Sequence, residues 1–274
     1  MTESYHHLLT GNLRFGNTIA DICRNEFSCE PEQIHEQVVL APWWQPTLLT
    51  PYGVTIEQLS DAHEGVWDLS LDGRRFTYIR TGIGAPVVID AVFALSGSPC
   101  RSILFLGSVG GLKPEIRIGD IVIPEYSVCG DGACRYVTTG SARENDCFGE
   151  RYAPDRAAFD ALCAIAAEVT ARAGTSWHIG RAFSVDTIFA QFAHIDEILA
   201  MGCNCIEMET AALFKASAAC GIRAGALFNV SDNTVTKQSL YSGRSDTEIE
   251  YQRQTRRSIL ARIALRALGA EMDE

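Results

Sequence analysis

The segment Ile-Leu-Phe-Leu-Gly-Ser-Val-Gly-Gly, residues 103–111, gives the clearest indication of the fold. Its four consecutive apolar residues are too few for a helix and are typical of a buried strand, and the glycines that follow predict a loop at the strand's end. A second buried strand is predicted at residues 224–230, and it leads into Ser231-Asp232-Asn233. Because α/β sheets bind ligands in the loops that follow their strands, both segments are candidates for a functional site.

Helices are predicted around these strands. Apolar residues recur at helical spacing in four stretches, residues 87–96, 155–173, 208–220 and 247–268. Further strands are predicted at residues 120–124 and 180–185, and in a hairpin over residues 66–80. This alternation predicts an α/β fold, a three-layer sandwich with a central mixed, largely parallel twisted sheet flanked by helices. We expect one domain over residues 1–274 with an atypical N-terminal segment, 1–62, whose residues 1–51 show no clear period.

The composition excludes several classes of function. A formal net charge of −11 opposes binding to the phosphate backbone of DNA or RNA, so we expect no nucleic-acid partner, whereas the charge does not exclude a small, neutral ligand. The apolar runs are far shorter than the roughly 20 residues of a membrane-spanning helix, and residues 1–10 lack a secretory pattern, so we expect a cytoplasmic protein with no membrane partner. The ten cysteines form no repeated C-x-x-C units and do not cluster with histidines. Free thiols and no metal site are therefore predicted.

Two acidic motifs are candidates for the chemistry. Glu207-Met208-Glu209 lies between a short apolar segment and a predicted helix, where carboxylates either cap the helix or face a ligand. Asp232 directly follows a buried strand, where it either forms an Asx turn or reaches a ligand. The glycine loops at 81–86 and 107–111 fit neither the dinucleotide-binding nor the P-loop pattern, so no nucleotide cofactor is predicted. Glycine does allow backbone N–H groups to approach a ligand closely.

Five segments occur in the order typical of one family: T-G-I-G-A-P at 81–86, G-S-V-G-G-L at 107–112, G-D-I-V-I-P at 119–124, E-M-E-T-A-A at 207–212 and V-S-D at 230–232. Together they resemble the nucleoside phosphorylase and nucleosidase superfamily. The resemblance implies a nucleoside phosphorylase-like domain that cleaves the N-glycosidic bond of a nucleoside. It also implies a homo-oligomer, from dimer to hexamer, and no cofactor, with inorganic phosphate as co-substrate only in a phosphorylase.

The resemblance assigns roles to individual residues. Met208 and Glu209 match the pair that holds the ribose, and Glu207 matches a supporting carboxylate. Asp232 matches the acid that protonates or hydrogen-bonds the base in the purine-acting branches, so a purine nucleoside is favoured. Side chains that pack against the base are expected at Phe183, Ile188 and Phe189. An acid is needed because the base leaves poorly as an anion, and an apolar setting would raise the pKa of Asp232.

The sequence departs from the family at the phosphate site. Phosphorylases bind phosphate with arginines, which suit oxyanions. Residues 41–46 read A-P-W-W-Q-P in place of an arginine loop, residues 63–67 read H-E-G-V-W in place of a second arginine segment, and Phe105 stands at a third arginine position. The remaining candidates for a nucleophile or anion pocket are Gly82, Gly84, Phe105, Gly107, Ser108 and Glu64, the last as the activator of water.

Three functions follow from this departure. Hydrolysis by water is favoured, because three arginine losses remove most of the charge that would hold phosphate. Phosphorolysis would need a rearranged anion site, built from Arg80, Arg135 or Arg244. A non-catalytic nucleoside-binding protein would retain Glu209 and the base pocket, but it has no use for a proton donor at Asp232.

Overall fold

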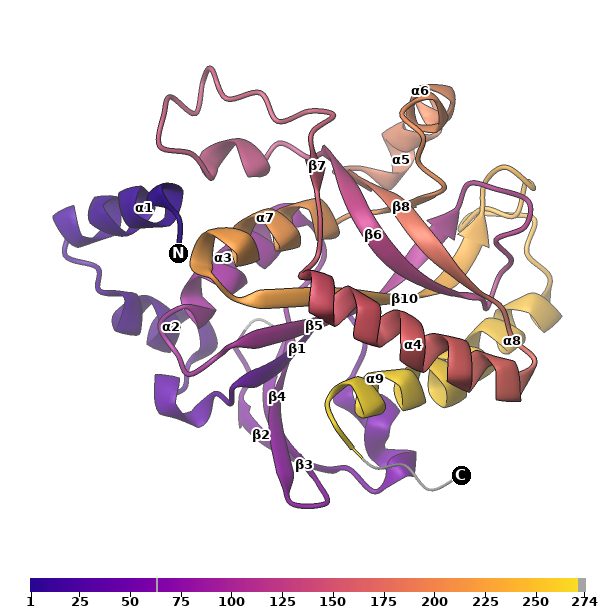
Figure 1. The fold of residues 1–274 in the computed structure, drawn as a ribbon, viewed down its shortest axis with the longest axis horizontal. Coiled ribbons are helices and arrows are strands. Elements are labelled where there is room, and N and C mark those ends of the chain that lie inside the picture. Colours follow the sequence, from indigo (N-terminus) through magenta and orange to yellow (C-terminus); the bar gives the residue numbers. More distant parts are fainter. Residues whose placement is uncertain (63, 271–274) are drawn as a thin grey trace.

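The computed structural model describes residues 1–62 and 64–270, and a ten-stranded sheet forms its middle layer (Figure 1). The strands are β1 (Gln37–Ala41), β2 (Thr55–Ser60), β3 (Val66–Leu71), β4 (Arg74–Arg80), β5 (Ser102–Gly111), β6 (Ile121–Gly130), β7 (Arg151–Tyr152), β8 (Trp177–Val185), β9 (Cys205–Glu207) and β10 (Arg223–Asn233). The helices are α1 (Glu3–Arg14), α2 (Ile19–Phe27), α3 (Ala85–Leu95), α4 (Arg156–Ala173), α5 (Ile188–Gln191), α6 (Ile195–Ala200), α7 (Thr210–Cys220), α8 (Asp246–Thr255) and α9 (Ala261–Ala267).

The sheet is mixed, and part of it closes on itself. Strand β5 pairs in parallel with β1 on one side and with β10 on the other. Strand β10 also pairs with β6, and the order continues through β8 and β9 back to β5, so these five strands form a ring. Strands β4, β3 and β2 extend the sheet beyond β1. The last residues of β5, β9 and β10 are thereby brought to one place.

Both faces of the sheet are covered by helices, as Figure 1 shows. Ile103 and Phe105 of β5 pack on one face with residues of α3 and α7. Leu104 and Leu106 point to the other face and pack with residues of α4 and α9. A strand buried on both faces needs a continuous apolar run rather than an alternating one, and burial of each such side chain contributes about 1.5–3 kcal/mol. The predicted α/β class, with a mixed sheet between helices, is confirmed.

The N-terminal region is more regular than predicted. Residues 1–51, which show no clear period, contain α1, α2 and β1. Helix α1 begins after Thr2, whose side chain accepts a hydrogen bond from the Tyr5 N–H, and α2 begins in the same way after Thr18. Tyr5 is the buried residue of α1, so this helix has almost no apolar stripe to detect. The sequence shows no clear period here because capping and tertiary contacts, rather than periodicity, hold these elements.

Two predicted loops are strand. Residues 107–111 belong to β5 and residues 231–233 belong to β10, because the two strands pair along their whole length. A bulge between Val230 and Asp232 shifts the register, and Asp232 then lies opposite Gly110. The C-terminal helix, predicted as continuous over 247–268, is divided into α8 and α9 by a π-helical turn, Arg256–Leu260. No helix of the described residues is long and apolar enough to cross a membrane.

Candidate active site

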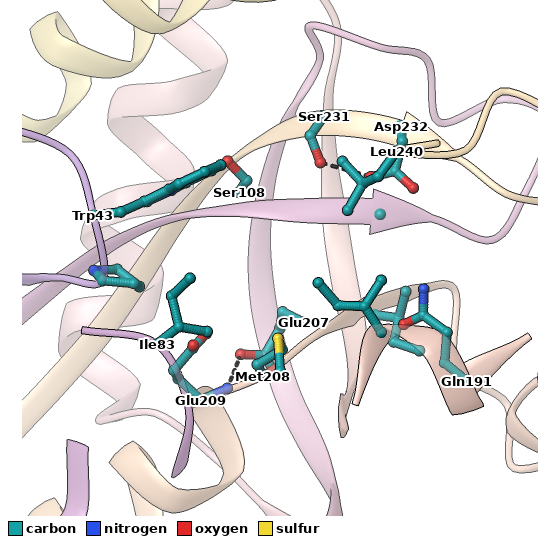
Figure 2. Close-up of a pocket in the computed structure, with 14 residues that line it drawn as sticks. Trp43, Ile83, Ser108, Gln191, Glu207, Met208, Glu209, Ser231, Asp232 and Leu240 are labelled. Carbon is teal, nitrogen blue, oxygen red and sulfur yellow. Dashed lines mark hydrogen bonds between the residues drawn. The ribbon is translucent and has the colours of Figure 1, made fainter. Parts of the chain in front are cut away.

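A cavity of about 260 Å³, here called the central cavity, lies at the ends of three strands (Figure 2). Strand β5 contributes Ser108 and Gly110, β9 contributes Glu207, and β10 contributes Ser231 and Asp232. The other residues that line it are Pro42, Trp43, Ile83, Ile188, Gln191, Ile206, Met208, Glu209 and Leu240. The cavity therefore has mostly apolar walls with a few polar groups, which is the usual composition of a small-molecule site.

Glu207 acts as the cap of helix α7. Its Oε2 accepts hydrogen bonds from the backbone N–H groups of Glu209 and Thr210, each at 2.7 Å, and its Oε1 accepts one from the Ser184 hydroxyl. These bonds satisfy the free N–H groups of the first turn. The capping interpretation of the acidic motif therefore holds for Glu207, which supports the residues after it.

Glu209 is buried and faces the central cavity. Its Oε1 accepts a hydrogen bond from the backbone N–H of Gly84, 2.8 Å away, at the start of α3. Burial, and then the neighbouring carboxylate of Glu207, raise the pKa of Glu209 to about 8. Burial likewise raises the pKa of Glu207, against the hydrogen bond from Ser184 and those from the backbone. Ionisation of Glu207 therefore opposes ionisation of Glu209, because like charges repel.

Asp232 lies on the other side of the central cavity from Glu207, Met208 and Glu209, as Figure 2 shows. Its Oδ1 accepts a hydrogen bond of 2.6 Å from the Ser231 hydroxyl. Burial raises the pKa of Asp232, while the Ser231 hydrogen bond and the positive charge of Arg244 lower it. A Cβ on Gly110 would lie 3.3 Å from Asp232 Oδ2, so the missing side chain at 110 makes room for the carboxyl group.

Several residues predicted for the site are therefore brought together. Asp232, Glu209, Met208, Ser108 and Ile188 line the same cavity, although they come from four separate parts of the chain. The Ser108 hydroxyl is buried and has no hydrogen-bond partner among the described residues. A buried hydroxyl without a partner costs free energy unless something pairs with it, which makes Ser108 a candidate for ligand binding.

The two aromatic residues predicted to contact the base, Phe183 and Phe189, do not line the central cavity. Phe183 lies in β8, packs edge-on against Phe148 with ring centroids 6.0 Å apart, and lines a separate cavity of about 390 Å³. Phe189 is 86% exposed. Helix α5 has a single turn, so Ile188 and Phe189 point in different directions and only Ile188 lines the cavity.

The predicted anion pocket is also partly wrong. Phe105 is fully buried and packs edge-on against Phe228, and a Cβ on Gly107 would lie 2.9 Å from that same ring. Glycine at 107 thus serves packing and not ligand approach. Glu64 forms an ion pair with Arg80 and does not line the central cavity, and His63 lies outside the described residues. Gly84 binds Glu209, as described above, and the Gly82 N–H donates to the Pro42 carbonyl oxygen.

Sequence reasoning missed other residues that line the cavity. Trp43 is 51% exposed and lies beside Ser108 in Figure 2, near Ile83. Gln191 is buried in α5, and Leu240 comes from the irregular segment after β10. Trp43 lies two residues after β1, and strand ends meet at ligand sites, but β1 has no pattern in the sequence that would reveal this position. Leu240 carries no signal either.

The electrostatics of the central cavity are acidic. Three carboxyl groups, those of Glu207, Glu209 and Asp232, line it, and none of the described residues that line it is an arginine, lysine or histidine. Arg244, one of the arginines predicted for a rearranged anion site, contacts two lining residues, and its guanidinium donates to the carbonyl oxygens of Ser231 and Leu240. The cavity suits a neutral molecule with hydroxyl groups and a basic ring atom better than an oxyanion.

The fold and the cavity define an α/β protein with a small-molecule site at the ends of its strands. A family model described as the phosphorylase superfamily matches residues 48–268, and this chain belongs to that superfamily. The match begins after Pro42 and Trp43, which form one wall of the central cavity. Family membership implies phosphate as co-substrate where the reaction is phosphorolysis, and no further cofactor.

Individual relatives agree with this family. Uridine phosphorylase of Escherichia coli K12 is 29% identical over 187 residues, which cover 63% of this chain and 69% of the relative. A DeoD-type purine nucleoside phosphorylase of Roseobacter denitrificans is 29% identical over 170 residues, 61% and 68% of the two chains.

Solved structures share the fold. Uridine phosphorylase of Vibrio fischeri ES114 superposes with a TM-score of 0.72 at 19% identity, over 90% of this chain and 98% of that one. Purine nucleoside phosphorylase of Toxoplasma gondii, in complex with immucillin-H, gives 0.71 at 17% identity, over 89% and 94%.

Proposed function

We propose that this protein cleaves the N-glycosidic bond of a purine nucleoside, with Asp232 as the proton donor and Glu209 as the group that binds the sugar hydroxyls. The observation that carries the proposal is the placement of these two buried acids on opposite sides of one cavity. Each has a raised pKa, mainly because of burial, so each can hold a proton at a higher pH than an exposed acid. A protonated acid beside a leaving group is a general acid catalyst.

The reaction follows from these positions. The bond between the sugar C1′ and the base nitrogen breaks, and its electron pair goes to the base. Asp232 delivers its proton to the five-membered ring of the base, so the base leaves neutral rather than as an anion. The sugar passes through an oxocarbenium-like state, and Glu209 orients it through its hydroxyl groups. The nucleophile's oxygen then bonds to C1′, and if that nucleophile is water it loses a proton, which restores the acid.

We favour water as the nucleophile. The described lining of the central cavity contains no cation to hold phosphate, and Glu209 would repel a dianion once it is ionised. The Ser108 hydroxyl, which has no partner in the protein, is available to a water molecule or to the sugar.

Phosphorolysis is the second candidate, because the relatives matched by the sequence are named as uridine and purine nucleoside phosphorylases. One feature of the structure favours it: the buried Nε of Arg80 has no hydrogen-bond partner among the described residues. Arg80 ends β4, three residues before Ile83, which lines the central cavity. A modest movement of Arg80 away from Glu64 would supply a guanidinium group for phosphate.

A product assay tests the proposal. Purified protein is incubated with a panel of purine and pyrimidine nucleosides, with and without inorganic phosphate, and free base, ribose and ribose 1-phosphate are measured. We expect free purine and ribose in both conditions, whereas ribose 1-phosphate formed only with phosphate would support phosphorolysis. Base released from pyrimidine nucleosides alone would refute the purine assignment, and no base released from any nucleoside in either condition would refute catalysis and leave a nucleoside-binding protein.

Asp232→Asn gives the matched test of the acid. The variant should lose roughly 10²–10⁴-fold in turnover, because general acid catalysis contributes that much, while binding of the nucleoside changes little. Asp160→Asn, at an exposed position of α4, is the control and should keep full activity. Equal turnover of Asp232→Asn and the wild type would remove Asp232 from the mechanism.

We also infer a cytoplasmic homo-oligomer, from dimer to hexamer, by analogy with the family. Light scattering coupled to gel filtration measures the assembly directly, and a strictly monomeric protein would contradict the inference.

A further inference from the structure

A second group of reactive side chains lies apart from the central cavity, where β6 ends. Cys129 is the penultimate residue of β6, Asp131 directly follows the strand, and Cys134 begins a short 3₁₀ helix, Cys134–Tyr136. All three are buried. Their ligand atoms, two sulfurs and a carboxylate oxygen, lie within 4.8 Å of one another. The sequence predicts no metal site because its cysteines form no repeated C-x-x-C units and do not cluster with histidines. In the structure, the carboxylate of Asp131 completes the group.

One carboxylate oxygen of Asp131, Oδ2, lies close to the sulfurs of both Cys129 and Cys134. Its Oδ1 accepts hydrogen bonds from the backbone N–H groups of Ala133 and Cys134, at 2.9 and 2.8 Å, which fix the side chain. Its Oδ2 lies 3.4 Å from Cys129 Sγ and 3.3 Å from Cys134 Sγ. Zinc bonds of about 2.3 Å to sulfur and about 2.0 Å to oxygen place such ligand atoms about 3.5 Å apart in a tetrahedron. The observed separations are close to that spacing.

We propose that Cys129, Asp131 and Cys134 form a zinc site with three protein ligands and a water molecule in the fourth position. Two thiolates and a carboxylate suit the borderline-soft Zn²⁺ better than Mg²⁺ or Ca²⁺, which prefer oxygen ligands. Two thiolates, one carboxylate and Zn²⁺ leave one net negative charge in a buried place. The ammonium group of Lys215 lies 3.0 Å from the Cys134 carbonyl oxygen and 3.0 Å from Cys147 Sγ, so a compensating positive charge is at hand.

The site would fasten the loop that follows β6. Gly132, between the ligands, donates its N–H to Asp186 Oδ2 at 3.0 Å. Gly132, Ala133 and Tyr136 line a cavity together with Ile83 and Met208, which also line the central cavity. A zinc ion at residues 129–134 therefore holds one wall beside the proposed active site. The inference does not depend on which reaction that site performs.

Metal analysis tests the proposal. The protein is purified without chelators from cells grown with added zinc, and its metals are measured by mass spectrometry. We expect about one zinc per chain in the wild type, and a loss of roughly tenfold or more in Cys134→Ser and in Asp131→Asn. Cys163→Ser, which changes a partly exposed cysteine of α4, is the matched control and should keep the metal. Zinc retained by both ligand variants would overturn the proposal.

A second experiment binds Co²⁺ to the wild-type protein. It needs no variant, so a variant that fails to fold does not affect its result. Co²⁺ bound by two thiolates should show a sulfur-to-cobalt charge-transfer band and the visible bands of a tetrahedral site. Wild-type protein that takes up neither zinc nor cobalt would refute the site. An intact mass lower by two hydrogen atoms, with loss of two free thiols, would assign a Cys129–Cys134 disulfide in its place.

Discussion

Replacing Glu209 with glutamine should change how the stability of the protein depends on pH. The pKa of this buried carboxyl group is raised from an ordinary value of 4.5 to about 8, first by burial and then by the charge of Glu207. Between these two pH values the folded protein holds a proton that the unfolded chain has released. The stabilisation is therefore complete below about pH 4.5 and is lost as pH rises through about 8.

The size of this effect follows from the shift. At about 1.4 kcal/mol per pKa unit, a change from 4.5 to about 8 corresponds to an upper limit of about 5 kcal/mol. Glutamine cannot ionise but can still accept the hydrogen bond from the Gly84 N–H, so the variant escapes this loss. We expect Glu209→Gln and the wild type to be equally stable, within about 1 kcal/mol, at about pH 5. At about pH 9 the variant should be more stable by a few kcal/mol.

Urea unfolding at several pH values measures the difference, with midpoints and slopes compared at each pH. Glu115→Gln, at an exposed position, is the control and should follow the wild type throughout. A Glu209→Gln variant whose stability falls with pH as steeply as that of the wild type would refute the assignment of a buried, protonated acid at 209.

Three further variants test other parts of the structure. Ser108→Ala should leave the urea midpoint unchanged or raise it, because the buried hydroxyl has no partner among the described residues, and should weaken nucleoside binding by roughly fivefold in calorimetry, since one hydrogen bond is worth about 1 kcal/mol. Gly97→Ala should destabilise the protein by about 1–3 kcal/mol in urea, because its Cβ would lie 2.5 Å from the Ile19 carbonyl oxygen. Phe105→Arg should not create a phosphate site but should lower stability by several kcal/mol, since it buries an unpaired charge; phosphate-dependent turnover gained with full stability would contradict this.

The parts of the fold that could be predicted are those with a local pattern. Residues 224–228 carry no polar side chain, as is typical of a strand buried on both faces, and helix α4 carries a regular apolar stripe. Strand β1 was missed because its five residues form a strand only through pairing with β4 and β5, which lie elsewhere in the sequence. The glycines at 107–111 were predicted as a loop for the same reason. Pairing with β10, which is distant in the sequence, holds these residues in a strand.

The candidate site divides in the same way. Local pattern placed Asp232 at a strand end and Glu209 at a helix start, where acids often serve only as caps, so their expected roles came from the resemblance of residues 207–212 and 230–232 to the family. Trp43 and Leu240 could not, since the segments that carry them have no period and reach the cavity only through the folded chain. Phe189 was misplaced by a single residue position: in a one-turn helix the neighbouring Ile188 faces the cavity while Phe189 faces solvent.

The charge of the central cavity separates the two possible nucleophiles. At a distance of about 5 Å and an effective dielectric constant of about 20, two unit negative charges repel by about 3 kcal/mol. Phosphate would meet this repulsion from Glu209 only when that group is ionised, and its pKa of about 8 keeps it mostly protonated at neutral pH. If phosphate is the nucleophile, its KM should therefore rise at least tenfold as pH increases from about 7 to about 9, and Glu209→Gln should remove that rise. A reaction with water has no phosphate KM, and base release that is unaffected by phosphate at every pH would assign the attack to water.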